Sequence, residues 1–251
     1  MTSADGTPYA AATPVRTAIV TGSASGIGAA TVHELQRQGY RTAGIDRVDE
    51  ALGLSPQQHL AIRADVTDEP ALVAAFDAAL AFLGHLDALV TSAGVADMTP
   101  FMELGVERFR EVHETNVIGT FVCIREAARR MGAGGRICTV ASVAGIRGGG
   151  LSGTAAYAAS KGAVLALTKN AARALAPMGI CVNTIAPGAT YTPMIAEQWK
   201  NDAHRSRVEA MSALNRTADP HEIAAGIAFL VSPQATSITG RWMAMSRKSG
   251  T

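Results

Sequence analysis

The sequence has almost no excess of charge and little charge overall. Lysine and arginine number 22 and aspartate and glutamate 21, which gives a formal net charge of +1, and charged residues make up only 17% of the chain. No block of basic residues breaks this balance. Because nucleic acids and anionic membrane surfaces are bound through concentrated positive charge, neither is expected as a partner.

Long apolar runs and cysteine motifs are also missing. No apolar stretch reaches the roughly 18 residues that span a bilayer. Residues 1–14 lack the basic start and apolar segment of a signal peptide, so a flexible tail is expected before a single domain of residues 15–251. The three cysteines are far apart and form no metal-ligand spacing, which predicts reduced, buried thiols and no metal. A cytoplasmic location is the default expectation.

The chain does contain many apolar residues, in an alternating pattern. Hydrophobic residues make up 48% of the sequence, enough for a sizeable core. The strand-like runs are Thr17–Thr21, Thr42–Asp46, Leu60–Ala64, Ala88–Thr91, Arg136–Ala141, Cys181–Ile185 and Trp242–Met245. Helix-like stretches between them include Ala29–Gln38, Ala71–Leu83, Val117–Met131 and Ala155–Ala176. This alternation predicts an α/β fold, with a single doubly wound parallel sheet and helices on both faces.

Two local features refine this organisation. Residues Asp219–Glu222 combine a capping aspartate, a proline in the first turn and a carboxylate three residues on, which is typical of a helix start. Residues 189–218 have weaker periodicity, so we expect them to form a mobile flap over the functional site.

A glycine-rich turn, Thr21–Gly28, stands between the first strand and the first helix. Its glycines let the backbone amides approach a pyrophosphate, and the helix N-terminus adds partial positive charge. A tight turn without a ligand is the alternative, but the position in an α/β chain favours a dinucleotide. The predicted cofactor-binding residues of the turn are Gly22, Ser25, Gly26, Ile27 and Gly28.

The ends of the second and third strands indicate which dinucleotide is bound. Asp46 lies 18 residues beyond the last glycine of the turn, and its carboxylate can accept both ribose hydroxyls and repel a 2′-phosphate. This favours NAD, although the neighbouring Arg47 leaves NADP open; a solvated surface arginine is the favoured interpretation. Asp65, followed by Val66, either reaches the adenine amino group or caps the turn after its strand.

Tyr157 and Lys161 lie four residues apart in a helix-like stretch, so both side chains share one face. Oxidation of an alcohol needs a base near neutral pH, because the hydroxyl proton leaves as the hydride departs. A lysine charge about 4–5 Å away can lower the tyrosine pKa of about 10 by two to three units. The pair is therefore interpreted as the acid/base; a core tyrosine beside a surface lysine is the alternative.

Together these motifs resemble the short-chain dehydrogenase/reductase family, from about Arg16 to Ala244. The matching pieces are Thr21–Gly28, Asp46, Asp65, Ala93–Gly94, Asn116, Ser142, Tyr157 with Lys161, and Pro187–Gly188 with Thr192. The resemblance implies a Rossmann-like fold and a nicotinamide cofactor. It also implies a homo-oligomer, a dimer or a homotetramer, paired through the alanine-rich helices Val117–Met131 and Ala155–Ala176.

The resemblance further implies roles for single residues. Tyr157 would be the acid/base, and Lys161 would hold the nicotinamide ribose and lower the tyrosine pKa. Ser142 would hydrogen-bond the substrate oxygen, and Asn116 would hold a water in a proton relay. Without the family, the last two are a serine after a strand and a polar residue in need of a partner. The remaining implied cofactor-binding residues are Ala93 and Gly94, with Pro187, Gly188, Thr190 and Thr192 at the nicotinamide carboxamide.

Three features depart from the family pattern. Thr91–Gly94 reads Thr-Ser-Ala-Gly where Asn-Asn-Ala-Gly is usual, so different side chains are expected to brace the central sheet. Ser246–Lys248 replaces the usual Asp-Gly-Gly, which makes the tetramer less secure than the dimer. Ser142 and Tyr157 are 15 residues apart, more than usual. We expect Ser142 to keep its place while the added residues bulge outward; the alternative is that Ser152 supplies the hydroxyl.

The predicted substrate wall is mostly apolar, with ordinary packing under the flap as the alternative. Its residues are Val95, Met98, Leu151, Met194, Ile195, Trp199 and Met211. Arg147 would meet a carboxylate, although a solvated loop arginine is favoured. The sequence thus predicts an oxidoreductase that uses NAD, with NADP not excluded, on an apolar secondary alcohol or ketone. The alternatives are an NADPH-dependent biosynthetic ketoreductase and a non-catalytic cofactor-binding regulator.

Overall fold

Seven strands form one parallel sheet in the computed structural model, which describes residues 15–149 and 154–245. The strands are β1 (Thr17–Thr21), β2 (Arg41–Asp46), β3 (His59–Arg63), β4 (Ala88–Thr91), β5 (Arg136–Val140), β6 (Cys181–Pro187) and β7 (Trp242–Met245). Their order is β3-β2-β1-β4-β5-β6-β7, and every neighbouring pair is parallel. The predicted doubly wound sheet is confirmed. The strand order reverses between β1 and β4, and a crevice at the carboxyl ends of the strands is expected there.

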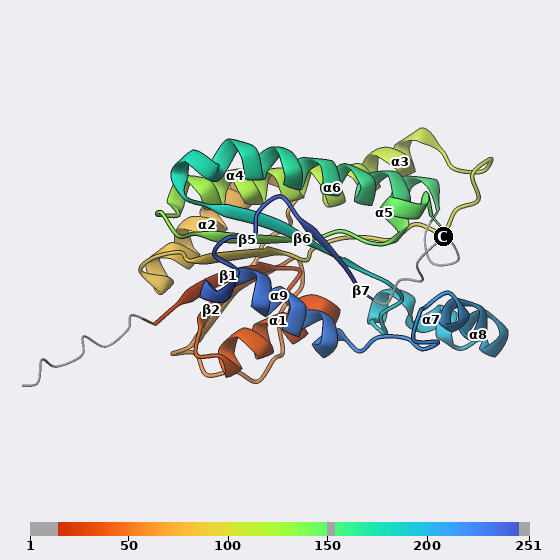
Figure 1. Cartoon of the computed structure of the whole chain (residues 1–251), viewed down its shortest axis with the longest axis horizontal. Coiled ribbons are helices and arrows are strands. Elements are labelled where there is room, and N and C mark those ends of the chain that lie inside the picture. Colours follow the sequence, from red (N-terminus) through yellow and green to blue (C-terminus); the bar gives the residue numbers. More distant parts are fainter. Residues whose placement is uncertain (1–14, 150–153, 246–251) are drawn as a thin grey trace, which may run out of the picture.

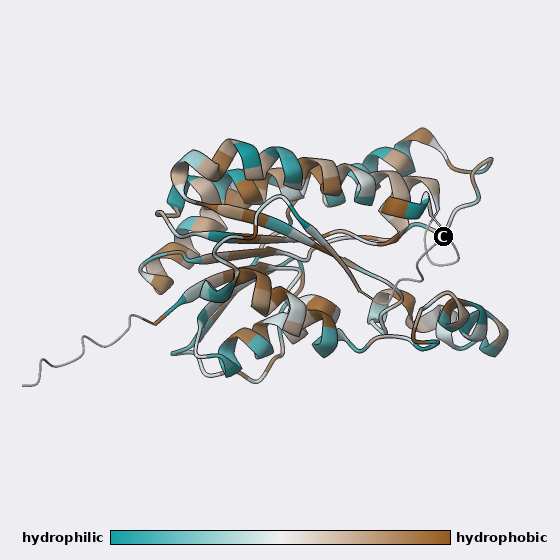
Figure 2. Cartoon of the chain, in the orientation of Figure 1, coloured by the Kyte–Doolittle hydropathy of each residue, from teal (hydrophilic) through white to brown (hydrophobic). Residues whose placement is uncertain are grey.

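Helices cover both faces of the sheet (Figure 1). One face carries α2 (Glu69–Leu83), α4 (Thr120–Arg130) and α6 (Ala155–Leu175), and the other carries α1 (Gly26–Arg37) and α9 (Pro220–Val231). The shorter elements are α3 (Val106–His113), the π-helix η1 (Glu114–Gly119), α5 (Ala144–Arg147), η2 (Ala176–Met178), η3 (Pro193–Ile195), α7 (Ala196–Trp199), α8 (Asp202–Ala210) and η4 (Pro233–Ala235). Figure 2 shows apolar strands between helices that are apolar on one side, as a sheet covered on both faces requires.

An apolar core lies on each face of the sheet. On one side, Phe76 of α2 packs in a cluster with Ile19 of β1, and both side chains are fully buried. On the other side, Leu35 of α1 belongs to a cluster with Ile227 of α9, and both are again fully buried. The two cores fix the sheet between its helices and so hold the carboxyl ends of the strands in register.

Helix α9 packs along α1, far away in the sequence. The Tyr40 hydroxyl, just after α1, donates to the Val231 carbonyl oxygen at 3.3 Å across 191 residues of chain. The start of α9 has the predicted cap: Asp219 accepts from the His221 amide at 2.8 Å, and Glu222 accepts from the Asp219 amide at 2.8 Å. The predicted helix start is therefore confirmed.

The ends of several predicted elements move by a few residues. Helix α2 begins at Glu69, because the Asp68 side chain caps it by accepting from the Ala71 amide at 3.1 Å. The predicted helix Val117–Met131 begins within the π-helix η1 and continues as α4. The segment predicted as a flap, residues 189–218, carries η3, α7 and α8; its mobility remains a prediction. The predicted tail, residues 1–14, lies outside the described residues.

The thiols differ in part from the prediction. All three cysteines are free, but Cys181 is half-buried, and it is the first residue of β6. Burial raises the pKa of Cys123 and of Cys138 to about 12, so both stay protonated at neutral pH. Within residues 15–149 and 154–245, no group of three or more His, Cys, Asp or Glu is placed to hold a metal. No helix in those ranges is both long and apolar enough to cross a membrane.

Candidate active site

A pocket of about 390 Å³ opens at the carboxyl ends of the central strands. It brings together most of the predicted site residues, which come from distant parts of the chain. Those that line it are Gly22, Ser25, Gly26, Ile27, Asp46, Arg47, Asp65, Val66, Ala93, Gly94, Ser142, Tyr157, Lys161, Pro187, Gly188, Thr190 and Thr192. Gly28 and Asn116 are absent from the lining and act from behind it. The pocket occupies the crevice where the strand order reverses, the usual ligand position in such sheets.

Two positions of the glycine-rich turn accept no residue other than glycine. Gly22 has φ of +69°, and a Cβ there would lie 2.6 Å from the Ala93 amide nitrogen. A Cβ on Gly28 would lie 1.9 Å from the Gly22 carbonyl oxygen. The turn therefore closes on itself and leaves its outer face, at the N-terminus of α1, to the pocket.

Asp46 fastens this turn to the end of β2. Its Oδ2 accepts from the Ala24 amide at 3.0 Å, and its Oδ1 accepts from the Val48 amide at 3.2 Å. Each carboxylate oxygen keeps lone pairs for a further donor. Arg47 is exposed and also lines the pocket. Both residues that the sequence connects with cofactor choice thus face the same space.

Asp65 caps the turn after β3, which was one of its two predicted roles. Its Oδ1 accepts from the Thr67 amide at 2.9 Å and from the Thr67 hydroxyl at 2.8 Å. Its Oδ2 makes no hydrogen bond within the described residues, and the side chain lines the pocket. Contact with an adenine amino group remains a prediction.

A buried polar chain, which the sequence did not reveal, backs the glycine-rich turn. The Ser23 hydroxyl donates to Glu50 Oε1, and Glu50 Oε2 lies 2.6 Å from His59 Nε2. The other ring nitrogen of His59 lies 2.8 Å from the Thr42 hydroxyl. The side chains of Glu50 and His59 are 3% and 6% exposed, and Gly44 makes room for the carboxylate. Because a buried carboxylate is unfavourable without partners, Glu50 stays fixed and holds Ser23 in place.

The end of β4 is braced by Thr21 of β1. The Thr21 carbonyl accepts from the Ser92 amide at 3.1 Å, and its hydroxyl accepts from the Ala93 amide at 3.4 Å. The Thr91 hydroxyl is buried and has no partner within the described residues. In this chain, which has Thr-Ser-Ala-Gly here, main-chain groups and the Thr21 hydroxyl brace the end of β4.

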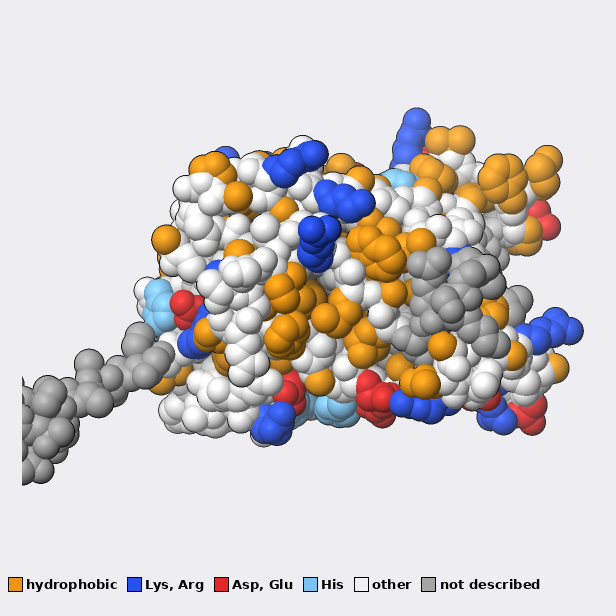
Figure 3. Space-filling view, in the orientation of Figure 1, with side chains coloured by type: hydrophobic (Ala, Val, Ile, Leu, Met, Phe, Trp, Pro, Cys, Tyr) orange, Lys and Arg blue, Asp and Glu red, His pale blue; other side chains and the backbone are white. Residues whose placement is uncertain are grey.

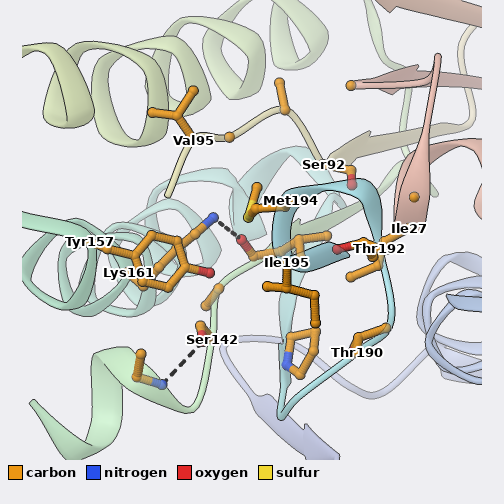
Figure 4. Close-up of a pocket in the computed structure, with 18 of the residues that line it drawn as sticks. Ile27, Ser92, Val95, Ser142, Tyr157, Lys161, Thr190, Thr192, Met194 and Ile195 are labelled. Atoms are coloured by element: carbon orange, nitrogen blue, oxygen red, sulfur yellow. Dashed lines mark hydrogen bonds between the residues drawn. The ribbon is translucent and has the colours of Figure 1, made fainter. Parts of the chain in front are cut away.

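Tyr157 and Lys161 project from α6 toward the pocket (Figure 4). The Lys161 Nζ lies 5.8 Å from the centre of the Tyr157 ring and donates to the Val140 carbonyl oxygen at 2.8 Å. Burial lowers the pKa of Lys161 to about 8. Burial also raises the pKa of Tyr157, while a hydrogen bond with Ser142 opposes that rise. The prediction that the tyrosine pKa falls below its usual value is therefore wrong for this structure, because burial raises it.

Ser142 follows β5 and lies beside Tyr157 (Figure 4). Its Oγ accepts from the Ala144 amide at 3.1 Å, at the start of α5. A hydroxyl that accepts one hydrogen bond still has its own O–H to donate. That O–H faces Tyr157, with which Ser142 forms a hydrogen bond, so it is placed to donate instead to an oxygen that enters beside the phenol. Leu151 and Ser152 lie outside the described residues, so the choice between Ser142 and Ser152 stays a prediction.

Asn116 lies in η1, fully buried, and has the partners that a buried amide requires. Its Oδ1 accepts from the Val95 amide at 2.8 Å, and its Nδ2 donates to the Val95 carbonyl at 3.0 Å. The same Nδ2 donates to the Ser160 hydroxyl at 2.9 Å. Asn116 thus fixes the main chain of Val95, which lines the pocket. Its role in holding a water remains a prediction.

The loop after β6 forms the wall opposite α6, with Thr190, Thr192, Met194 and Ile195 (Figure 4). The members of the predicted substrate wall that line the pocket are Val95, Met194, Ile195 and Met211. Two assignments are wrong. Met98 is 39% exposed outside the pocket, and Trp199 packs into a small core with Ile195 and Val208. Lining residues that the sequence did not reveal include Val143, Ala144, Val208 and Ser212.

Comparison with known proteins defines the family. The sequence model of a family described as enoyl-(acyl carrier protein) reductase matches residues 22–246. A crystal structure of a dehydrogenase/reductase from Sinorhizobium meliloti 1021 is 35% identical, with a TM-score of 0.83, and the match covers 92% of this chain and 93% of that chain. A short-chain dehydrogenase/reductase from Brucella melitensis is 31% identical with a TM-score of 0.85, covering 92% and 94%. The chain belongs to the short-chain dehydrogenase/reductase family.

Two relatives narrow the class of reaction. A cis-4-hydroxycyclohexanecarboxylate dehydrogenase from Sinomonas cyclohexanicum is 38% identical over 239 residues, covering 92% of this chain and 94% of the relative. A 2,5-dichloro-2,5-cyclohexadiene-1,4-diol dehydrogenase from Sphingobium indicum is 36% identical over 238 residues, covering 91% and 94%. The chain is therefore an oxidoreductase that uses NAD or NADP and acts on the CH–OH group of a small molecule, or on the corresponding ketone.

Proposed function

We propose that the protein is an NAD-dependent dehydrogenase of a cyclic secondary alcohol. The observation that carries the proposal is the meeting of Ser142, Tyr157 and Lys161 in the pocket that also contains the glycine-rich turn. The pocket fits a dinucleotide, because the turn at the start of α1 is closed behind and open toward the pocket, with Asp46 as an acceptor beside it. The names of two relatives, which act on six-membered rings, support a ring substrate.

The residues of the chain handle the proton. The nicotinamide, when bound, supplies the acceptor for the hydride. Ser142 donates to the alcohol oxygen through its remaining O–H, and Tyr157 takes the hydroxyl proton. The phenol needs neighbouring positive charge to act as a base near neutral pH, since burial raises its pKa. Lys161, with its pKa lowered to about 8, still carries that charge in most molecules at neutral pH.

Oxidation of ring alcohols tests this function. The purified protein is mixed with cyclohexanol or 4-methylcyclohexanol and with NAD or NADP, and the absorbance of the reduced nicotinamide is followed. We expect turnover with both alcohols. Absence of turnover with every pairing, in a protein that binds the cofactor, would contradict the proposed function and favour a cofactor-binding regulator.

The preference for NAD is part of the same proposal. Asp46 offers an acceptor to ribose hydroxyls, and its charge is unfavourable beside a 2′-phosphate. NADP is the second candidate, because the exposed side chain of Arg47 lines the same part of the pocket. The ratio of kcat/KM for the two cofactors decides between them. Arg47→Ala is the informative variant, because Asp46 also fastens the Ala24 amide and its loss would disturb the turn.

We also propose that the protein forms a homo-oligomer. Ile118 of η1 and Phe121 of α4 are 46% and 44% exposed. Exposed apolar side chains of this kind are typical of a surface that binds a second copy of the chain. Trp242 on the edge strand β7 is 40% exposed, and Figure 3 shows apolar side chains over β6, β7 and α9. If both surfaces bind a second copy, the assembly is a tetramer; if only one does, it is a dimer. Light scattering at micromolar concentration tests this, and a monomer would contradict it.

A further inference from the structure

One cationic side chain at the substrate end of the pocket has no partner in the part of the chain that the structure describes. Arg147 is the last residue of α5, is half-buried and lines the pocket. Within the described residues its guanidinium makes no hydrogen bond and no ion pair, although its backbone amide donates to the Val143 carbonyl oxygen at 3.0 Å. Other arginines, such as Arg108, Arg125 and Arg130, are bonded to carboxylates. A guanidinium is always charged and presents five donors, so a half-buried one without acceptors is unusual inside a pocket.

Among the described residues that line the pocket, no acidic side chain lies at the end where Arg147 stands. The acidic side chains that line the pocket are Asp46 and Asp65, which belong to the ends of β2 and β3 at the nucleotide end. The residues that line the substrate end are apolar or uncharged, apart from Lys161 and Arg147 itself. The apolar members include Val95, Met194, Ile195, Val208 and Met211. Positive charge in such a place attracts a ligand that carries the missing negative charge.

The position of Arg147 relative to Ser142 fits a ligand with two polar ends. Ser142 holds the start of α5 by accepting from the Ala144 amide at 3.1 Å, and Arg147 ends the same short helix. Five residues separate the two, which is a rise of about 7.5 Å if the whole stretch is taken as helical. That separation is comparable to the span of a six-membered ring with a polar substituent at each end. A ring whose hydroxyl lies at Ser142 and Tyr157 would direct a substituent on its far side toward α5.

We propose that Arg147 binds a carboxylate of the substrate, so that the substrate is a cyclic hydroxy acid or the matching keto acid. The proposal rests on the proposed function of this site and names the chemical class of its substrate. Arginine pairs with a carboxylate through two parallel hydrogen bonds, which fixes orientation as well as charge. The methionines around it adapt to the ring. The sequence favoured a solvated loop arginine at this position. In the structure, Arg147 instead ends a short helix, is half-buried and lines the pocket.

A binding experiment tests Arg147 without catalysis. Cyclohexanecarboxylate and cyclohexanecarboxamide have similar shape, and neither carries a hydroxyl that can react. Each is titrated calorimetrically into the protein saturated with reduced cofactor. We expect the carboxylate to bind about tenfold to a hundredfold more tightly than the amide, the effect of a hydrogen bond to a charged group. Arg147→Gln should abolish that preference.

Arg207 provides the matched control for this experiment. It lies on α8, is exposed and does not line the pocket, so Arg207→Gln makes the same change of charge at a distance. The control variant should keep the preference for the carboxylate. Equal affinity for the two compounds, failure of the carboxylate to bind, or a preference that survives in Arg147→Gln would each overturn the proposal.

Turnover separates this proposal from the proposed function. The substrates are 4-hydroxycyclohexanecarboxylate and 4-methylcyclohexanol, compared by kcat/KM. We expect the acid to be preferred at least about tenfold. Arg147→Gln should raise KM for the acid far more than for the methyl compound, with kcat for the acid changed only a few-fold, and Arg147→Lys should restore part of the loss. Equal oxidation of both alcohols overturns the role of Arg147 and leaves the dehydrogenase intact. No oxidation of either one contradicts the proposed function, while the titration still decides whether Arg147 binds a carboxylate.

Discussion

The two ends of the pocket are built in opposite ways. At the nucleotide end, polar groups of the protein bind one another: Ser23 is held by Glu50, Glu50 by His59, and Ala24 by Asp46. At the substrate end, apolar side chains line the pocket together with an arginine whose side chain has no partner within the described residues. The glycine-rich turn is therefore braced before a ligand arrives, whereas the arginine at the substrate end depends on the ligand for its polar contacts. Substitutions at the first end should affect cofactor binding and stability, and those at the second should affect turnover and choice of substrate.

The largest effect is expected for Tyr157→Phe. Loss of the phenolic oxygen removes the proton acceptor, and general acid–base catalysis contributes about 10²- to 10⁴-fold in rate. Affinity for the reduced cofactor should stay within a few-fold, because the ring keeps its place; steady-state rates and a fluorescence titration measure the two quantities. Tyr191→Phe makes the same change on a side chain that is 55% exposed and should leave both unchanged. A parallel loss of cofactor binding would break the distinction between the two ends.

A smaller effect is expected for Glu50→Gln, which changes the buried chain behind the glycine-rich turn. The amide keeps the size of the side chain but weakens its bonds to Ser23 and His59. We expect the free energy of unfolding to fall by about 1–3 kcal/mol. The dissociation constant for NAD should rise several-fold while kcat changes little. Asp49→Asn, at a side chain that is 84% exposed, is the control for both urea unfolding and NAD titration. Unchanged NAD affinity would show that the turn does not need this brace.

Lys161→Met should stabilise the protein without cofactor while it removes most activity. Burial lowers the pKa of Lys161 from 10.5 to about 8, so the unfolded chain binds the proton more tightly. The native protein therefore bears an unfavourable charge below pH 8, and this penalty fades as pH rises from 8 to 10.5. At pH 7 we expect the variant to gain about 1–2 kcal/mol, after the lost bond to the Val140 carbonyl is allowed for.

Urea unfolding of the wild type and Lys161→Met at several pH values measures this gain. The advantage of the variant should be largest below pH 8 and should shrink toward pH 10.5. A variant that is less stable than the wild type at pH 7 would show that the bond to Val140 outweighs desolvation.

The smallest effect on stability is expected for Met194→Ala. Met194 lines the substrate end and is 46% exposed, so the free energy of unfolding should change by less than about 0.5 kcal/mol. The ratio of kcat/KM between a large and a small ring alcohol should nevertheless change, since the side chain forms part of the wall. Met178→Ala, also 46% exposed but outside the pocket, should change neither quantity.

The fold and the nucleotide end follow closely from the sequence because their signals are local. Strand-like runs and the position of the glycine-rich turn define which segments form the crevice. Gly22 and Gly28 are required by contacts within the turn or with the neighbouring strand, so a glycine pattern is enough to find them. The Asp219–Glu222 cap is equally local, since its hydrogen bonds join neighbouring residues.

The features that the sequence did not reveal depend on distance in space. Glu50 and His59 lie in different segments, and nothing in either segment indicates that they meet. Trp199 is a large apolar residue of the kind expected in the substrate wall, but in the fold it packs into the small core with Ile195 and Val208. The pKa of Tyr157 was misjudged because spacing along a helix gives the nearness of Lys161 and not the depth of burial. Burial and tertiary pairing are properties of the folded chain.

The packing of α9 on α1 also has a consequence for the time at which the site is formed. Proteins are synthesised from the N-terminus, so the glycine-rich turn leaves the ribosome long before Pro220–Val231. Until then Leu35 lacks the cover of Ile227, and contacts this distant in sequence close late in folding. The nascent chain therefore carries a cofactor-binding turn on a helix with an open apolar face. A growing chain should acquire affinity for the nucleotide only after Pro220–Val231 has emerged, and should be most exposed to aggregation just before that point.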